Sequence, residues 1–123
     1  MTFLTIDQQT GLTAAFAGAW VNTNTITGAW TLKINVNSIV PPSGSSTVNV
    51  RLEFDDSISG TAALCGPTVS FANQLGPSYD KVHSFKQQDF PDLRLGIAGS
   101  QIRLQLTDIT SGASVSYRAW LEY

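Results

Sequence analysis

Charged residues are scarce in this sequence. They make up 13% of its 123 residues, and Lys and Arg together number only 7. About a quarter of an average globular protein is charged, and long surface helices usually carry many Lys and Glu residues. Here Ser, Thr, Asn and Gln replace the missing charges; Thr suits strands, whereas Ser and Asn suit turns. The composition therefore predicts strands and turns and argues against helices.

The shortage of basic residues also limits the partners. A formal net charge of −2 and an isoelectric point near 5.0 leave no basic surface for a phosphate backbone. No apolar run approaches the roughly 20 residues of a membrane-spanning helix. The first residues lack the basic and apolar regions of a secretory signal. We therefore expect no nucleic-acid or membrane partner, and a chain that is made and left in a cytosol unless a removed leader preceded it.

Reactive side chains are few as well. The chain has one cysteine, Cys65, and one histidine, His83, which are too few for a four-ligand zinc site. A catalytic Cys65/His83 pair is a weaker interpretation than a buried thiol and a surface histidine on strands. Asp55 and Asp56 suggest either a calcium site or a strand-ending turn, and the missing calcium-loop spacing favours the turn. We expect no catalytic residue, metal or cofactor, and a protein that is not an enzyme.

Alternation of apolar and polar residues is the strongest pattern that is present. It runs through residues 30–37 and again through 48–54, with a Pro/Ser/Gly-rich turn between them. Residues two apart share one face of a strand. The pattern predicts two half-buried strands that pair as an antiparallel hairpin, with Trp30 in the core. The second run places four apolar residues on the core face: Val48, Val50, Leu52 and Phe54.

Further strands follow from weaker patterns. Residues 101–107 and 115–123 alternate and predict a second hairpin. We also expect strands at 12–21 and 79–86, and a strand over 61–65 and 68–71 that breaks at Gly66-Pro67, because proline is confined to edges and bulges. About eight strands at regular spacing predict a single domain, 1–123. Its predicted fold is an all-β, antiparallel β-sandwich, jelly-roll-like, with no substantial helix.

The first ten residues can form either an N-terminal arm or an edge strand. Phe3, Leu4 and Ile6 make a short apolar stretch that is long enough to add as a strand to the open sheet edge of a neighbouring molecule. Leu4 and Ile6 would then fill pockets on the neighbour. On this hypothesis, residues 1–7 can be removed without loss of the fold.

The aromatic residues allow a sugar-binding interpretation. Trp20, Trp30, Trp120 and Tyr79 are candidates for a sugar-stacking platform, although Trp30 is in register with core residues. Trp120 shares a face with polar neighbours on its strand and is predicted to project outward. One outward aromatic is consistent with either a subunit contact or a sugar site. The candidate partner-contact residues are Phe3, Leu4, Ile6 and Trp120.

The order of these patterns resembles a family. A Trp-initiated strand with Leu-x-Ile-x-Val is followed by a Ser/Gly-rich turn and a Val-x-Val-x-Leu-x-Phe-Asp-Asp-Ser strand. Arg-Leu-Gln-Leu and Ser-Tyr-Arg-Ala-Trp-Leu strands come later. Over residues 29–123 this looks like the small all-β structural proteins of tailed bacteriophages, such as capsid decoration (cement) proteins. The resemblance implies a β-sandwich that binds an assembled capsid lattice, and it brings no catalytic residues.

The sequence therefore leads to two functional expectations. The first is a non-enzymatic virion structural protein that stabilises the capsid, binds the major capsid protein or other virion proteins, and forms homo-oligomers. It would be assembled in the host cytoplasm and lie on the capsid surface. The alternative is a carbohydrate- or receptor-binding module of a tail or fibre, with a glycan as its partner. Many copies on a lattice would gain strength through avidity, so weak contacts suffice for the first function.

Overall fold

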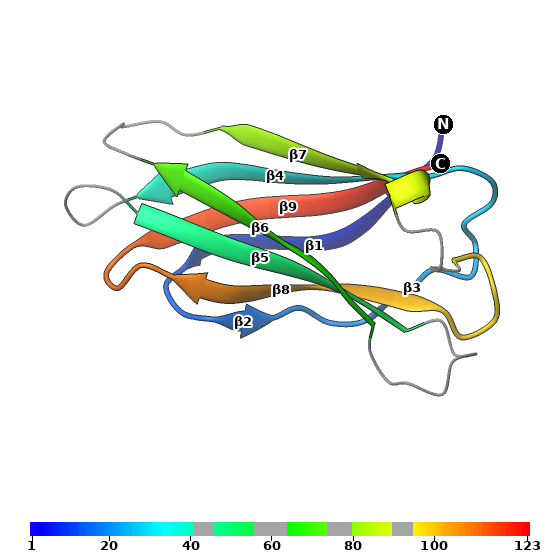
Figure 1. Ribbon diagram of the computed structural model, residues 1–123, viewed down its shortest axis with the longest axis horizontal. Helices are drawn as coiled ribbons and strands as arrows, with labels where there is room; N and C mark the ends of the chain where they lie inside the picture. The colour runs from blue at the N-terminus through cyan, green and yellow to red at the C-terminus, as the bar shows by residue number, and fades with distance from the viewer. Residues whose placement is uncertain (41–45, 56–63, 74–79, 90–94) are drawn as a thin grey trace.

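Two antiparallel β-sheets pack face to face in the computed structural model (Figure 1). The structure describes residues 1–40, 46–55, 64–73, 80–89 and 95–123, without the side chains of residues 64–67 and 73. The predicted all-β class and β-sandwich are confirmed. Both termini lie at the same end of the sandwich, where the backbones of Thr2 and Tyr123 exchange hydrogen bonds of 2.6 and 2.9 Å.

The strands are distributed between the sheets as follows. The first sheet contains, in spatial order, β1 (Phe3–Leu12), β9 (Ser114–Glu122), β4 (Thr31–Val40) and β7 (Lys81–Lys86). In the second sheet, β2 (Phe16–Ala17) and β3 (Val21–Asn22) both pair with β8 (Gln101–Ile109), and β5 (Ser46–Asp55) and β6 (Leu64–Asn73) follow. A 3-10 helix spans Gln87–Asp89. In the described part of the chain, no helix is long and apolar enough to cross a membrane.

The strand order is that of a jelly roll. If β2 and β3 are taken as two halves of one strand, each sheet has four strands, and the order β1-β9-β4-β7 faces the order β2/β3-β8-β5-β6. Counted in this way, successive strands lie in opposite sheets, except that β5 and β6 pair within the second sheet. The jelly-roll-like architecture is therefore present.

The two predicted hairpins are wrong. β4 pairs with β9 and β7, whereas β5 pairs with β6 and β8, so residues 30–37 and 48–54 lie in different sheets. In the same way β8 and β9, expected as the second hairpin, belong to opposite sheets. Two strands that face each other across a core show the same alternation as two strands that pair side by side. The pattern therefore identifies the buried face of a strand but not its neighbour.

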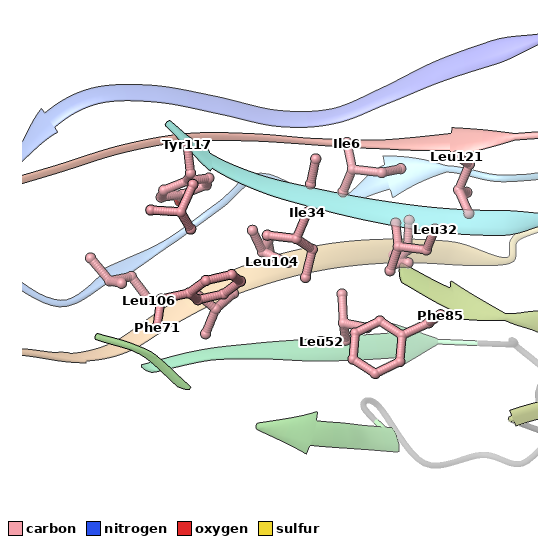
Figure 2. Packing of buried hydrophobic residues seen from close by; sticks show 14 of the residues in the cluster. Ile6, Leu32, Ile34, Leu52, Phe71, Phe85, Leu104, Leu106, Tyr117 and Leu121 are labelled. Carbon is pink, nitrogen blue, oxygen red and sulfur yellow. The ribbon is translucent and has the colours of Figure 1, made fainter. Parts of the chain in front are cut away.

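The core lies between the sheets, and Figure 2 shows side chains from both layers meeting there. The predicted core face of β5 is confirmed, because Val48, Val50, Leu52 and Phe54 are at most 2% exposed. Trp30, which precedes β4, is also buried as predicted, at 3% exposure.

A bulge replaces the predicted break at Gly66-Pro67. β6 is continuous, but its pairing with β5 shifts from Arg51 opposite Thr68 to Glu53 opposite Cys65. Two residues of β6 therefore lie opposite one residue of β5. Proline has no N–H to donate, and a bulge leaves a residue unpaired. The strand absorbs Pro67 in this way without ending.

The predicted strand over residues 12–21 is also wrong. Leu12 ends β1, and only the short strands β2 and β3 follow, separated by Gly18. A Cβ atom at Gly18 would lie 2.7 Å from Asp7 Oδ2 and 2.9 Å from the Leu104 carbonyl oxygen. The backbone passes too close to both neighbours for a side chain, so glycine is required where the strand is interrupted.

Candidate functional site

The predicted contact residues Phe3, Leu4 and Ile6 do not share one environment in the structure. Phe3 is 61% exposed, whereas Ile6 is 5% exposed and Leu4 packs against the same core. β1 pairs with β9 from Phe3 opposite Glu122 onward, so the N-terminal segment is an edge strand of its own sandwich. Removing residues 1–7 would take Ile6 out of the core and leave one edge of β9 without its partner along residues 119–122. The expectation that this segment is dispensable for folding therefore no longer holds.

A bulge at Ile6 sets the direction of the side chains on β1. The register with β9 shifts between Thr5 and Asp7, so the consecutive residues Ile6 and Asp7 are both buried. Simple alternation would have turned one of them outward. Beyond the bulge Gln8 is exposed. The exposed residues Phe3, Thr5 and Gln8 remain on the outer side of the strand.

Asp7 fastens β1 to β9 through a buried network. Tyr117 Oη donates a hydrogen bond of 2.9 Å to Asp7 Oδ2, and Gln9 Nε2 donates one of 2.9 Å to Oδ1. Burial, and then the charge and hydrogen bond of Asp7, raise the pKa of Tyr117 well above its usual range. The phenol therefore stays protonated and keeps donating to the buried carboxylate. This network ties β1 to β9 on the inner side of the sheet.

Trp120 projects from the outer face of β9, as predicted. Its indole Nε1 donates a hydrogen bond of 3.0 Å to Glu122 Oε1, which also lies 3.1 Å from Lys33 Nζ. The hydrogen bonds from Trp120 and Lys33 hold the pKa of the Glu122 carboxyl below its usual range. The guanidinium of Arg118 lies over the indole, 4.9 Å from the ring centroid. The indole is thus fixed by Glu122 at its N–H group and by Arg118 over its ring.

These side chains line an open groove of about 330 Å³ over β1 and β9, here called the β1–β9 groove; its lining residues are Phe3, Thr5, Gln8, Arg118, Ala119, Trp120 and Glu122. The register explains the set, because Phe3 lies opposite Glu122, Thr5 opposite Trp120, and Gln8 opposite Arg118. Of the four candidate contact residues, the groove brings together Phe3 and Trp120. Leu4 and Ile6 lie on the other side of the strand.

Sequence reasoning missed most of the polar lining. Arg118 and Glu122 flank Trp120 at spacings of two, so strand periodicity was a sufficient signal to include them. Thr5 had the same signal relative to Phe3, whereas Gln8 lies beyond the bulge and had none. Both residues lie beside Trp120 and Arg118 because β1 pairs with a strand more than a hundred residues away in the sequence, which no local pattern predicts.

The predicted aromatic platform does not form. Trp30 is in the core, and Trp20 packs under the guanidinium of Arg103, 4.6 Å from the ring centroid, on the outer face of the second sheet. Trp120 lies on the outer face of the first sheet, on the opposite side of the sandwich. Tyr79 lies outside the described residues. Trp120 is therefore the single tryptophan of the β1–β9 groove.

A second polar cluster covers the outer face of β5 and β8. Glu53 is only 3% exposed and accepts hydrogen bonds from Arg103 Nη2 at 2.7 Å and Nε at 3.1 Å. Arg51 Nη2 lies 3.3 Å from Glu53 Oε1 and donates to Gln105 Oε1 at 2.8 Å. The buried carboxylate is paired with two cations, which is the arrangement that burial of a charge requires. This cluster joins two strands and offers no reactive group.

The remaining reactive residues do not come together in the described part of the chain. His83 is exposed on β7 and contacts Phe85, with 4.6 Å between ring centroids. The Cys65 side chain and Asp56 lie outside the described residues. Within the ranges that the structure describes, no group of three or more His, Cys, Asp or Glu side chains is placed to hold a metal ion.

Comparison with known proteins identifies no relative. No family model, no curated protein and no solved structure matches this chain.

Proposed function

We propose that this protein is a non-enzymatic virion structural protein, a capsid decoration protein that binds the assembled capsid lattice through its β1–β9 groove. The observation that carries the proposal is the meeting of Phe3 and Trp120 on one open groove. The resemblance of residues 29–123 to phage structural proteins supports the capsid as the partner.

The groove has the properties of a protein-binding surface. Aromatic residues and arginine are enriched at interfaces and contribute most of the binding energy there, and Phe3, Trp120 and Arg118 supply all of these types. Because the Asp7–Tyr117 network and the Trp120–Glu122–Lys33 contacts fix the surface in advance, little conformational entropy is lost on binding. Repetition of the protein over a lattice multiplies such contacts.

The fold agrees with this role by analogy. Jelly rolls occur in viral capsid proteins and in lectins, and a fold alone does not define a function. Both of the functions expected from the sequence are compatible with this fold, and the groove must distinguish between them.

Attachment through the groove replaces the idea that the N-terminal segment adds to a neighbour's sheet. The register of β1 shifts twice, between Thr5 and Asp7 and between Gln9 and Leu12. Bulges bend an edge strand and interrupt its row of free hydrogen-bonding groups, which hinders pairing with another strand. In addition, Leu4 and Ile6 are committed to the core. Phe3 remains the available contact residue of this segment.

Co-sedimentation tests the proposal. The particles are capsids assembled from the major capsid protein of the phage that encodes the chain. Phe3→Glu and Trp120→Ala should each reduce the bound fraction, because they remove the aromatic anchors. Val82→Glu is the matched control, since Val82 is 57% exposed, close to the 61% of Phe3, but lies on β7 at the other edge of the sheet. Equal binding of all three variants and the wild type would contradict attachment through the groove.

Glycan binding is the second candidate function, and it is supported by the composition of the groove. An open groove near the size of small-ligand sites, with Trp120 beside Thr5 and Gln8, combines an apolar surface with hydrogen-bonding groups. A glycan array probed with the wild type and Trp120→Ala tests this function. Retention of the wild type alone, without sedimentation on capsids, would replace the decoration function with a lectin-like one.

A further inference from the structure

Arg118 differs from the other cations of the β1–β9 region and of the opposite sheet. Arg51 and Arg103 are paired with Glu53, and Lys33 is paired with Glu122. Arg118 is exposed, and among the residues that the structure describes no carboxylate forms an ion pair with it. Its contact is with the ring of Trp120. In a chain with a net charge of −2, this leaves a positive charge without a partner inside the groove.

The contact with Trp120 orients the guanidinium without using its hydrogen bonds. A guanidinium over an aromatic ring interacts through its face, whereas its N–H groups point outward in its own plane. That plane matches a carboxylate, which accepts two parallel hydrogen bonds from arginine. The contact therefore positions Arg118 over the indole and uses no hydrogen-bond acceptor, so that its N–H donors can bind an anion.

The residues around Arg118 determine what kind of anion fits the groove. Phe3 presents an exposed apolar ring to the same groove, and Gln8 lies opposite Arg118 in the register of β1 and β9. Glu122 is turned to Lys33 and Trp120, so its negative charge is already balanced. An anion next to an apolar group would thus find a cation, an amide and an aromatic surface together.

We propose that the β1–β9 groove binds an Asp or Glu side chain of the capsid protein, with its carboxylate on the guanidinium of Arg118 and an adjacent apolar side chain against Phe3. This inference rests on the proposed function and names the chemistry of its partner. A protein carboxylate fits better than a stacked sugar, because the guanidinium of Arg118 lies over the indole ring on which a pyranose would stack.

The first test uses the isolated protein and needs no capsid. The side-chain Nε–Hε resonance of Arg118 is followed by NMR during titration with N-acetylglutamate amide, with the neutral N-acetylglutamine amide as the matched probe. We expect the acid to shift this resonance and the neutral amide to leave it in place. Equal shifts with both probes, or none with either, would overturn the assignment of Arg118 as a carboxylate anchor. A shift with glucuronate that N-acetylglutamate amide does not produce would assign the groove to an acidic glycan instead.

The second test measures binding to capsids. Arg118→Gln should weaken binding by about tenfold or more, as expected for loss of a charge-assisted hydrogen bond, and should flatten its salt dependence. Arg118→Lys keeps the charge but not the planar pair of donors. Its affinity for capsids should therefore lie between that of the wild type and that of Arg118→Gln. Lys86→Gln is the control, because it removes one exposed positive charge from β7. The wild-type protein should no longer bind to capsids whose surface carboxylates have been converted to amides.

The two proposals fail in different ways. If the wild type does not sediment with capsids at all, the decoration function fails while the NMR titration still tests Arg118. If Arg118→Gln sediments as well as the wild type, and Phe3→Glu does not, the capsid function stands and the carboxylate contact is overturned. Arg118 is exposed, so its variants should fold; circular dichroism checks this.

Discussion

The two edges of the first sheet are built differently. β7 is a strand of 6 residues with a lysine at each end, whereas β1 has 10 residues and its one charged side chain, Asp7, is turned inward. Edge strands expose unpaired backbone groups and need protection from pairing with other molecules. β7 is protected by charge and shortness, and β1 by its bulges.

The inner face of β7 also shows where the core ends. Lys81, His83 and Phe85 lie opposite the core residues Val36, Ile34 and Leu32 of β4, yet only Phe85 of the three is buried. Polar side chains on the inner side of an edge strand discourage extension of the sheet. β7 thus closes the sheet.

β1 in contrast contributes to both sides of its sheet. Its inner side supplies Ile6 and Asp7 to the interior, and its outer side supplies Phe3 to the groove. The bulge turns Asp7 inward beside Ile6, whereas Phe3 faces outward by simple alternation with Leu4. One edge of the sheet therefore limits the fold, while the other carries the candidate contact surface.

The largest expected difference between the edges is in folding. Ile6→Asp should prevent folding or cost several kcal/mol, because it buries a charge in the core. Val82→Asp, on the outer side of β7, should change the free energy of unfolding by less than about 0.5 kcal/mol. Chemical denaturation measures both. Similar losses in the two variants would mean that the edges contribute equally to the core.

The Asp7–Tyr117 contact should account for a smaller part of the stability of β1. Asp7→Ala and Tyr117→Phe should each destabilise the protein by about 1–3 kcal/mol, because each leaves a buried polar partner without its hydrogen bond. The double variant should cost less than the sum of the two, since the lost bond is shared. Full additivity in denaturant unfolding would show that the two residues do not interact in solution.

Stability at high pH should report the same contact. The pKa of Tyr117 is raised in the folded state, so its contribution is complete below the unfolded pKa of about 10. Above that pH the unfolded chain loses the proton first, and stability falls as the pH rises. Thermal melts between pH 9 and about 11 should show a steeper decline for the wild type than for Tyr117→Phe. An equal fall in melting temperature for both proteins would show that Tyr117 does not cause the loss of stability at high pH.

The smallest expected change in stability concerns the charges of β7. Replacing both Lys81 and Lys86 by Val should alter the free energy of unfolding by no more than about 0.5–1 kcal/mol, because both side chains are exposed. The double variant should nevertheless associate at high protein concentration, since its edge loses the protecting charges. Light scattering at increasing concentration measures this. A variant that remains as monodisperse as the wild type would show that shortness alone protects β7.

Alternation in the sequence is enough to predict the buried side of the clearly alternating strands, such as β5 and β9. Alternation has a period of two and depends only on consecutive residues, so the core face of β5, the burial of Trp30 and the outward Trp120 could be predicted without a partner strand. Composition was enough for the all-β class for a similar reason, because strand and turn preferences are local.

Which strands are neighbours follows from the fold of the whole chain and not from any one strand. An alternating strand can bury its apolar face either beside or across from the next one, and the jelly roll places β4 and β5, and also β8 and β9, across from each other. The groove depends on the same decision, since Phe3 meets Trp120 through pairing of the first strand with the last. Bulges at Ile6 and Pro67 then shift the register. Such pairings are chosen by the packing of the whole sandwich, and no short stretch of residues contains that information.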